Sequence, residues 1–230
     1  MLIYLLPIFI VAAIFLVYAS YSIQSGIYMK ALCRNPEKGK VIALTFDDGP
    51  DRIQTPKVLD ILKEYNVKAC FFCIGSKIEG NEDILLRIKE EGHLIGNHSF
   101  NHFFSFPLHS SQRMKNELSC CQEKIENVTG DRTILFRPPF GVTNPTIAKA
   151  VKALGYITIG WSIRSLDTYR KEEVALKRIK QRLKPGAVIL LHDPLPISDS
   201  LLPEVLKLLK ENDYAIERID KLFDIPKTTI

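Results

Sequence analysis

Short apolar runs alternate with amphipathic stretches over most of the chain. The apolar runs, each of the length of a strand, cover residues 41–44, 69–74, 93–96, 133–136, 157–161, 187–191 and 215–219. Stretches with the apolar spacing of helices lie between them, over residues 58–65, 83–91, 111–128, 146–154, 172–183 and 201–211. Repeated strand and helix units predict an α/β fold with a mainly parallel sheet of about seven strands, open or closed into a barrel.

The N-terminal segment has a different pattern. The first 29 residues contain no charged side chain, and only Tyr4 interrupts the apolar run between positions 2 and 17. Counting to Ile23 gives about the 20 residues that a helix needs to span a bilayer. A cleaved signal peptide is the alternative, since Ala19 and Ser20 are small, but the basic region that begins signal peptides is missing. We therefore predict an uncleaved transmembrane anchor over residues 1–23.

The rest of the chain divides simply. Residues 24–39 contain two glycines, a proline and two serine or asparagine residues, which is typical of a linker. The part that follows is long enough for one hydrophobic core and shows no internal repeat. We expect one domain over residues 40–225 and a short tail over 226–230.

Charge narrows the range of partners. The chain has 31 basic and 26 acidic residues, which gives a formal net charge of +5. No long basic run or interleaved aromatic stripe is present, so nucleic acid is not an expected partner. Four basic residues, Lys30, Arg34, Lys38 and Lys40, closely follow the apolar segment and favour a cytoplasmic domain by the positive-inside rule.

Two adjacent carboxylates, Asp47 and Asp48, follow the first apolar run of the domain, within the sequence Thr-Phe-Asp-Asp-Gly-Pro. The Gly-Pro pair ends the strand in a turn, where both carboxylates can face one site. Like charges this close are costly unless a cation or a proton separates them. The alternative is an exposed turn, because Asp and Gly are ordinary turn residues.

Two imidazoles follow the third apolar run. His98 and His102 are four residues apart and reach one cation if the segment forms a helical or tight turn. A surface turn with two histidines is the alternative, because such short patterns are frequent. Asp48 would complete a set of two histidines and one carboxylate, which leaves coordination positions open as hydrolytic metals require.

Two other strand ends also have polar residues. Arg137 begins the sequence Arg-Pro-Pro-Phe-Gly after the run at 133–136, and its guanidinium could hold a carboxylate in a fork geometry. His192 ends the run at 187–191 with a group that titrates near neutral pH. The carboxyl ends of barrel strands lie on one face, so we expect these clusters to form one site.

The clusters together resemble those of the polysaccharide deacetylases of the NodB-homology class, also called carbohydrate esterase family 4. The similar region covers residues 40–222, and its blocks occur in the family order at 45–50, 98–102, 137–141, 161–167 and 190–192. The resemblance implies a distorted (β/α) barrel that holds one divalent metal ion, usually zinc. It also implies hydrolysis of N-acetyl groups from a glycan that contains N-acetylglucosamine, with release of acetate.

The resemblance gives the first three blocks a role on the metal side of the site. Asp48, His98 and His102 match the metal ligands of the family. Asp47 matches the base that activates the attacking water, and Arg137 matches the residue that orients this base.

The resemblance gives the remaining residues roles around the substrate. His192 matches the general acid, and Asp167 matches its partner. The backbone N–H of Phe140 matches an oxyanion donor, Leu190 the wall of the acetyl-methyl pocket, and Trp161 begins the block that forms one groove wall.

The fourth block departs from the family pattern. Arg164 stands where the family often has an aspartate, and Thr168 stands where it often has a tryptophan. If this segment stays extended, strand alternation places Arg164 and Asp167 on opposite faces. We therefore expect Arg164 to point away from Asp167.

The sequence thus predicts a membrane-anchored, monomeric, metal-dependent N-deacetylase. One alternative is an amidohydrolase of the same fold that acts on a small amide or imide, but such an enzyme would not need an anchor. The other is a non-catalytic glycan-binding membrane protein, which the full set of polar residues argues against. A cell-wall substrate places the domain on the outer side of the membrane, and we give this more weight than the short basic flank.

Overall fold

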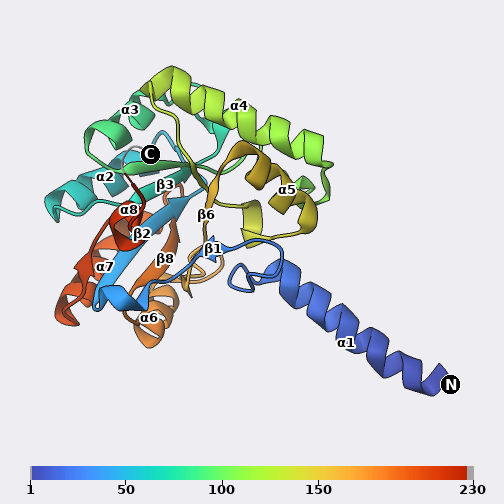
Figure 1. Ribbon diagram of the computed structural model, residues 1–230. Helices are drawn as coiled ribbons and strands as arrows, with labels where there is room; N and C mark the ends of the chain where they lie inside the picture. The colour runs from blue at the N-terminus through green and yellow to red at the C-terminus, as the bar shows by residue number, and fades with distance from the viewer. Residues whose placement is uncertain (1, 227–230) are drawn as a thin grey trace.

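A parallel sheet organises the chain (Figure 1). The structure, a computed structural model, describes residues 2–226, with side chains from residue 7 onward. The strands are β1 Ala31–Leu32, β2 Val41–Asp47, β3 Cys70–Cys73, β4 Leu94–Asn97, β5 Leu135–Phe136, β6 Ile157–Ile159, β7 Ile163–Arg164, β8 Ala187–His192 and β9 Ala215–Ile216. Their order is β1-β6-β5-β4-β3-β2-β8-β7, with β9 beside β2.

The sheet differs from the prediction in its closure and its strand number. It has nine strands instead of about seven, and its pairs within residues 2–226 form a path from β1 to β7 that does not close. The predicted α/β class with parallel strands is confirmed, and the predicted distorted barrel is a curled half-barrel whose path of strand pairs does not close. The additional strands β1 and β7 are only two residues long, which is too short for a periodic pattern to indicate.

The described residues also form eight α-helices, and all but the first pack around the sheet (Figure 1). They are α1 Leu2–Tyr21, α2 Gln54–Glu64, α3 Glu82–Glu90, α4 Ser111–Thr129, α5 Pro145–Leu154, α6 Glu172–Arg182, α7 Ser198–Glu211 and α8 Ile219–Leu222. Local capping fixes several of their ends. The Asn144 side chain accepts a hydrogen bond from the N–H of Ile147 with Pro145 at the first helical position, a cap that contributes about 1 kcal/mol.

The central strand β2 separates two parts of the core. Ile42, Leu44 and Phe46 pack on one side with α2, α3, α6 and α7. Ala43 packs on the other side with the inner residues of β3 and β8. Because side chains alternate along a strand, Asp47 shares the inner side with Ala43, at the carboxyl end of β2.

The segment expected as a linker contributes to the sheet. Ala31 and Leu32 within residues 24–39 form β1, which pairs in parallel with Thr158 and Ile159 of β6. The N–H of Asn35 also donates to the carbonyl of Gly186 at 2.9 Å. This stretch is therefore bonded to the domain at both of these points.

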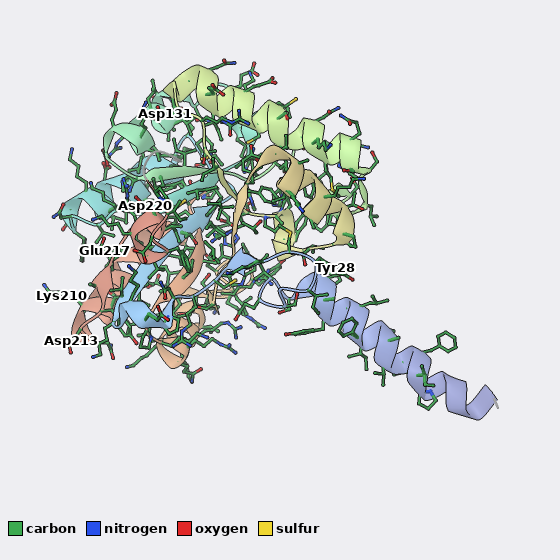
Figure 2. All side chains as sticks on the ribbon, in the orientation of Figure 1. Tyr28, Asp131, Lys210, Asp213, Glu217 and Asp220 are labelled. Carbon is green, nitrogen blue, oxygen red and sulfur yellow. The ribbon has the colours of Figure 1, made fainter. Side chains whose placement is uncertain are left out.

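Helix α1 extends away from the rest of the chain, and Figure 2 shows its side chains projecting outward, with Tyr28 where the helix meets the domain. The Thr143 N–H and hydroxyl donate to the carbonyls of Ser20 and Ala19 at 2.8 and 3.1 Å. Within the part of the chain that is described, no helix has the length and apolar character of a membrane span. The predicted transmembrane anchor over residues 1–23 is therefore not confirmed. The predicted tail over 226–230 lies outside the described residues except at Pro226.

Candidate active site

The site begins at the end of β2, where the backbone redirects one of two carboxylates. Asp47 is 3% exposed and points inward, as strand alternation requires. Asp48 would point to the opposite face, but its φ of 73° places it in the left-handed region and turns the chain. Such a conformation is costly for a residue with a Cβ and is typical of functional sites. Both carboxylates consequently face the same space.

The loop after β4 brings two imidazoles to Asp48. Ser99 and His102 both have positive φ, of 65° and 54°, so the loop folds back sharply after the strand. The Nε2 atoms of His98 and His102 each lie 3.5 Å from Oδ1 of Asp48. Nδ1 of His98 lies 2.8 Å from the carbonyl oxygen of Arg137, to which it donates when it is protonated, leaving Nε2 free to act as a ligand.

These three residues fit a divalent metal ion. One ligand atom from each of Asp48, His98 and His102 lies within 4.8 Å of the others. Oδ1 of Asp48 is buried and has no hydrogen-bond partner, so a ligand there would satisfy an otherwise costly polar atom. Two imidazole nitrogens and one carboxylate oxygen suit zinc and leave a coordination position open.

The charge states of these groups also suit a cation. Burial and then the neighbouring charge of His98 lower the pKa of His102 to about 4, so its imidazole is neutral near pH 7. Burial alone would raise the pKa of Asp48, but its interactions with His98, His102 and His192 lower it well below its usual range. A neutral imidazole at His102 and an ionised carboxylate at Asp48 are the forms in which these two groups bind metals.

A buried arginine orients the second carboxylate. Arg137 is 0% exposed, and its Nη1 lies 2.7 Å from Oδ1 of Asp47 and 2.8 Å from the hydroxyl of Thr45. Its other nitrogens donate to the carbonyls of Ile159 and Gly160 at 3.1 and 2.9 Å. Because its guanidinium donates to four acceptors, Arg137 is held in place and fixes Asp47 in one orientation. The other carboxylate oxygen of Asp47, Oδ2, accepts no bond from Arg137 and is available to accept a proton.

An acid–imidazole pair faces the carboxylates from β8. Nδ1 of His192 lies 2.8 Å from Oδ1 of Asp167, and the backbone N–H of His192 donates to Oδ2 at 2.9 Å. The hydroxyl of Ser165 donates to the same carboxylate at 2.8 Å. Burial alone would lower the pKa of His192, but the hydrogen bond and negative charge of Asp167 raise it above its usual value. His192 is therefore suited to donate a proton near neutral pH.

The predicted site residues surround one cavity of about 110 Å³. The lining residues are Asp47, Asp48, His98, His102, Phe140, Gly141, Trp161, Arg164, Thr168, Tyr169, Leu190 and His192. Arg137 and Asp167 lie behind this surface and act on Asp47 and His192. Phe140 has a φ of 60°, and its ring lies 4.6 Å from that of His102. The oxyanion role of its N–H stays a prediction.

Several residues of the site were not predicted from the sequence. Thr45 accepts from Arg137, and it could have been found because it lies two residues before Asp47 on the same strand face. Ser165 bonds to Asp167 from the same loop. Asp193 is 1% exposed, accepts a hydrogen bond from the hydroxyl of Thr55 and lies against Gly49. Nothing in the sequence around Asp193 distinguishes it from an ordinary turn residue.

A curled parallel α/β sheet that has a possible metal cluster, a buried carboxylate and an acid–imidazole pair at the carboxyl ends of its strands is an arrangement suited to a hydrolase of acyl groups. Residues 34–159 match the family described as polysaccharide deacetylase. The chain belongs to this family, which is also carbohydrate esterase family 4, and it is a polysaccharide N-deacetylase.

Known relatives agree with this assignment. The chain is 34% identical over 190 residues to the peptidoglycan-N-acetylmuramic acid deacetylase PdaA of Bacillus subtilis, covering 80% of this chain and 72% of the relative. It is 35% identical over 202 residues to the peptidoglycan-N-acetylglucosamine deacetylase PgdA of Listeria monocytogenes, covering 85% of this chain but only 42% of that protein. The crystal structure of the Bc1960 peptidoglycan N-acetylglucosamine deacetylase superposes with a TM-score of 0.80 at 30% identity, covering 86% and 94% of the two chains.

Proposed function

We propose that this protein removes N-acetyl groups from a peptidoglycan-type glycan, releases acetate, and depends on one divalent metal ion, zinc. A single observation supports the proposal above the others. The cluster of Asp48, His98 and His102 lies in the same cavity as the carboxylate held by Arg137 and the imidazole held by Asp167. Relatives named for both N-acetylglucosamine and N-acetylmuramic acid support a glycan substrate without choosing between the sugars.

Asp48, His98 and His102 would hold the metal, and the remaining residues would move protons. A bound divalent cation lowers the pKa of water and polarises a carbonyl group. Asp47 accepts a proton from the attacking water through the oxygen that Arg137 leaves available. Because Arg137 is held by four hydrogen bonds, the carboxylate of Asp47 is already oriented and does not have to rotate when it takes that proton.

His192 completes the reaction on the side of the leaving group. The water oxygen forms a bond to the acetyl carbon, and the bond from that carbon to the amide nitrogen breaks. The imidazolium of His192 donates its proton to this nitrogen, so that acetate and a free amine leave. Leu190 is 2% exposed and lies in the cavity wall, where an acetyl methyl group would meet an apolar surface.

Helix α1 would attach the protein to a membrane on the outer side, where peptidoglycan lies. Its large apolar side chains between positions 8 and 17 are 51–69% exposed; they are Ile8, Phe9, Ile10, Val11, Ile14, Phe15, Leu16 and Val17. Soluble proteins rarely expose apolar surface of this extent, so a lipid environment would suit the helix. Separation of membrane and soluble fractions, with a cytoplasm-dependent reporter at the C-terminus, tests both attachment and side. A strong reporter signal would move the substrate to a cytoplasmic or lipid-linked precursor.

Acetate release tests the proposal directly. The full chain is incubated with N-acetylglucosamine oligomers and with peptidoglycan, before and after chelation, and again after zinc is restored. We expect acetate only when metal is present, and loss of activity in Asp48→Asn but not in Asp60→Asn, whose carboxylate is 69% exposed, pairs with Arg87 and does not line the cavity. Full turnover after exhaustive metal removal would refute metal dependence.

A further inference from the structure

Arg164 is a cationic residue in the wall of the active-site cavity. It ends β7, and its register partner on the parallel strand β8 is Leu190, which lines the same cavity. Its guanidinium carbon lies 6.0 Å from the centre of the Trp161 ring, which is 9% exposed. We expected Arg164 only to point away from Asp167, and the structure places it in the wall of the active-site cavity. The chain stops being extended after Arg164, and Leu166 has a φ of 65°, so strand alternation does not apply to this loop.

The charge of Arg164 has no acidic partner within residues 7–226. Its side chain takes part in no ion pair and no hydrogen bond there, and only its carbonyl accepts a bond, from Arg178 at 2.8 Å. The carboxylate of Asp167 is bonded to Ser165 and His192 instead. The expectation that Arg164 points away from Asp167 agrees with these contacts, since no ion pair or hydrogen bond joins the two side chains among the described residues.

Other arginines add to the positive charge beside the cavity. The Nε of Arg178 donates to the carbonyl of Arg164 at 2.8 Å, and burial and the charges of Arg182, Arg164 and Arg170 lower the pKa of Arg178. Within the described side chains, none of these arginines forms an ion pair. Of these arginines Arg164 lines the cavity, where an unpaired cation attracts anionic substrates and repels cationic ones.

We propose that Arg164 binds a carboxylate of the glycan, so that the preferred substrate is an N-acetylated sugar with an acidic substituent, such as N-acetylmuramic acid. This inference rests on the proposed deacetylation. A guanidinium binds a carboxylate through two parallel N–H···O bonds. A neutral N-acetylglucosamine oligomer would cover Arg164 without supplying such a partner and would therefore leave a desolvated, unpaired charge. The preference between the two substrates therefore has two sources. The guanidinium attracts the carboxylate of the acidic substrate, and binding of the neutral substrate costs free energy because the guanidinium loses water without gaining a partner.

The carboxylate has two possible sources on such a glycan, the lactyl ether of the sugar and the attached peptide. Four substrates separate them: a glycan with free lactyl carboxylates and no peptide, its methyl ester, the peptide-bearing glycan, and an N-acetylglucosamine oligomer. Acetate release by the zinc-loaded full chain is measured on each. We expect kcat/KM to be about 10- to 100-fold higher for the free carboxylate than for the methyl ester. A preference seen only with the peptide-bearing glycan would assign the carboxylate to the peptide.

Variants test whether Arg164 causes the preference. In Arg164→Gln the rate on the carboxylate substrate should fall far more than the rate on the ester, so that their ratio approaches one. Arg164→Lys, which retains the charge but not the fork, should retain part of the preference. Arg113→Gln removes an exposed charge on α4, outside the cavity lining and away from the arginines around Arg164, and should leave the ratio unchanged.

Two results would overturn the inference while acetate release continues. Equal rates on the acid and the ester in the wild-type protein would show that no carboxylate is recognised. An equal loss on both substrates in Arg164→Gln would show that the side chain only supports Trp161. Acetate from none of the four substrates would instead refute the proposed hydrolysis, on which the inference depends.

Discussion

The ion pair between Arg137 and Asp47 should contribute strongly to stability as well as to catalysis. Both side chains are nearly inaccessible to water, with side-chain exposures of 0% and 5%. Arg137→Ala leaves a buried carboxylate without its cation, which costs about 3–5 kcal/mol. It also removes the charged donors from the carbonyls of Ile159 and Gly160, each worth about 1–3 kcal/mol when unsatisfied. Allowing for non-additivity, we expect a loss of about 5 kcal/mol or more.

A loss of this size is comparable to the whole stability of many domains, about 5–15 kcal/mol. The control is Arg87→Ala, whose side chain makes three hydrogen bonds, against four for Arg137, but is 30% exposed. Exposed pairs contribute about 0.2–1 kcal/mol each, so this variant should lose far less. Urea unfolding can be followed by fluorescence of Trp161, the only tryptophan, which lies 5.5 Å from the Arg137 guanidinium carbon.

A double-mutant cycle separates the charge from the packing. Asp47→Asn removes the uncompensated charge, so adding it to Arg137→Ala should recover part of the lost free energy of unfolding. The coupling energy should be at least about 1–2 kcal/mol if the buried charge dominates. A free energy of unfolding for Arg137→Ala within about 1 kcal/mol of the wild-type value would refute the reasoning, since it would mean that water replaces the guanidinium without cost.

The other predictions concern the remaining parts of the site. Asp167→Asn removes the negative charge that raises the pKa of His192, so the alkaline limb of the pH–rate profile should move to lower pH and kcat/KM should fall about 10- to 1000-fold; an unchanged profile, with His192→Ala inactive, would show that another group tunes the acid. His98→Ala should lower zinc affinity at least about 100-fold, measured as bound metal per chain, while circular dichroism stays native. Gly49→Ala would place a Cβ against the carboxylate of Asp193 and should destabilise the protein by about 1–3 kcal/mol, measured by thermal unfolding. An unfolding midpoint equal to that of the wild-type protein would show that the Asp193 side chain moves aside without cost.

The sequence predicts the main strands and helices because their side chains repeat with the period of each element. The run at 41–44 becomes β2, and the spacing over 111–128 becomes α4, Ser111–Thr129. What it could not predict are the short edge strands. Strand β1 exists because Ala31 and Leu32 find free backbone groups on β6, a tertiary property that two residues cannot signal.

The same contrast holds for the active site. Asp48, His98 and His102 could be placed together because each follows a strand, and the ends of parallel strands meet at one edge of the sheet. The position of Arg164 could not be predicted in this way, because it depends on where β7 stops and on a left-handed Leu166. The regular strands thus fix the residues that would perform the chemistry, while the point at which β7 ends determines which charge lies in the cavity wall. If Arg164 binds a carboxylate as proposed, its replacement would change substrate preference without disturbing the metal cluster, since Arg164 makes no side-chain hydrogen bond or ion pair with the other described residues.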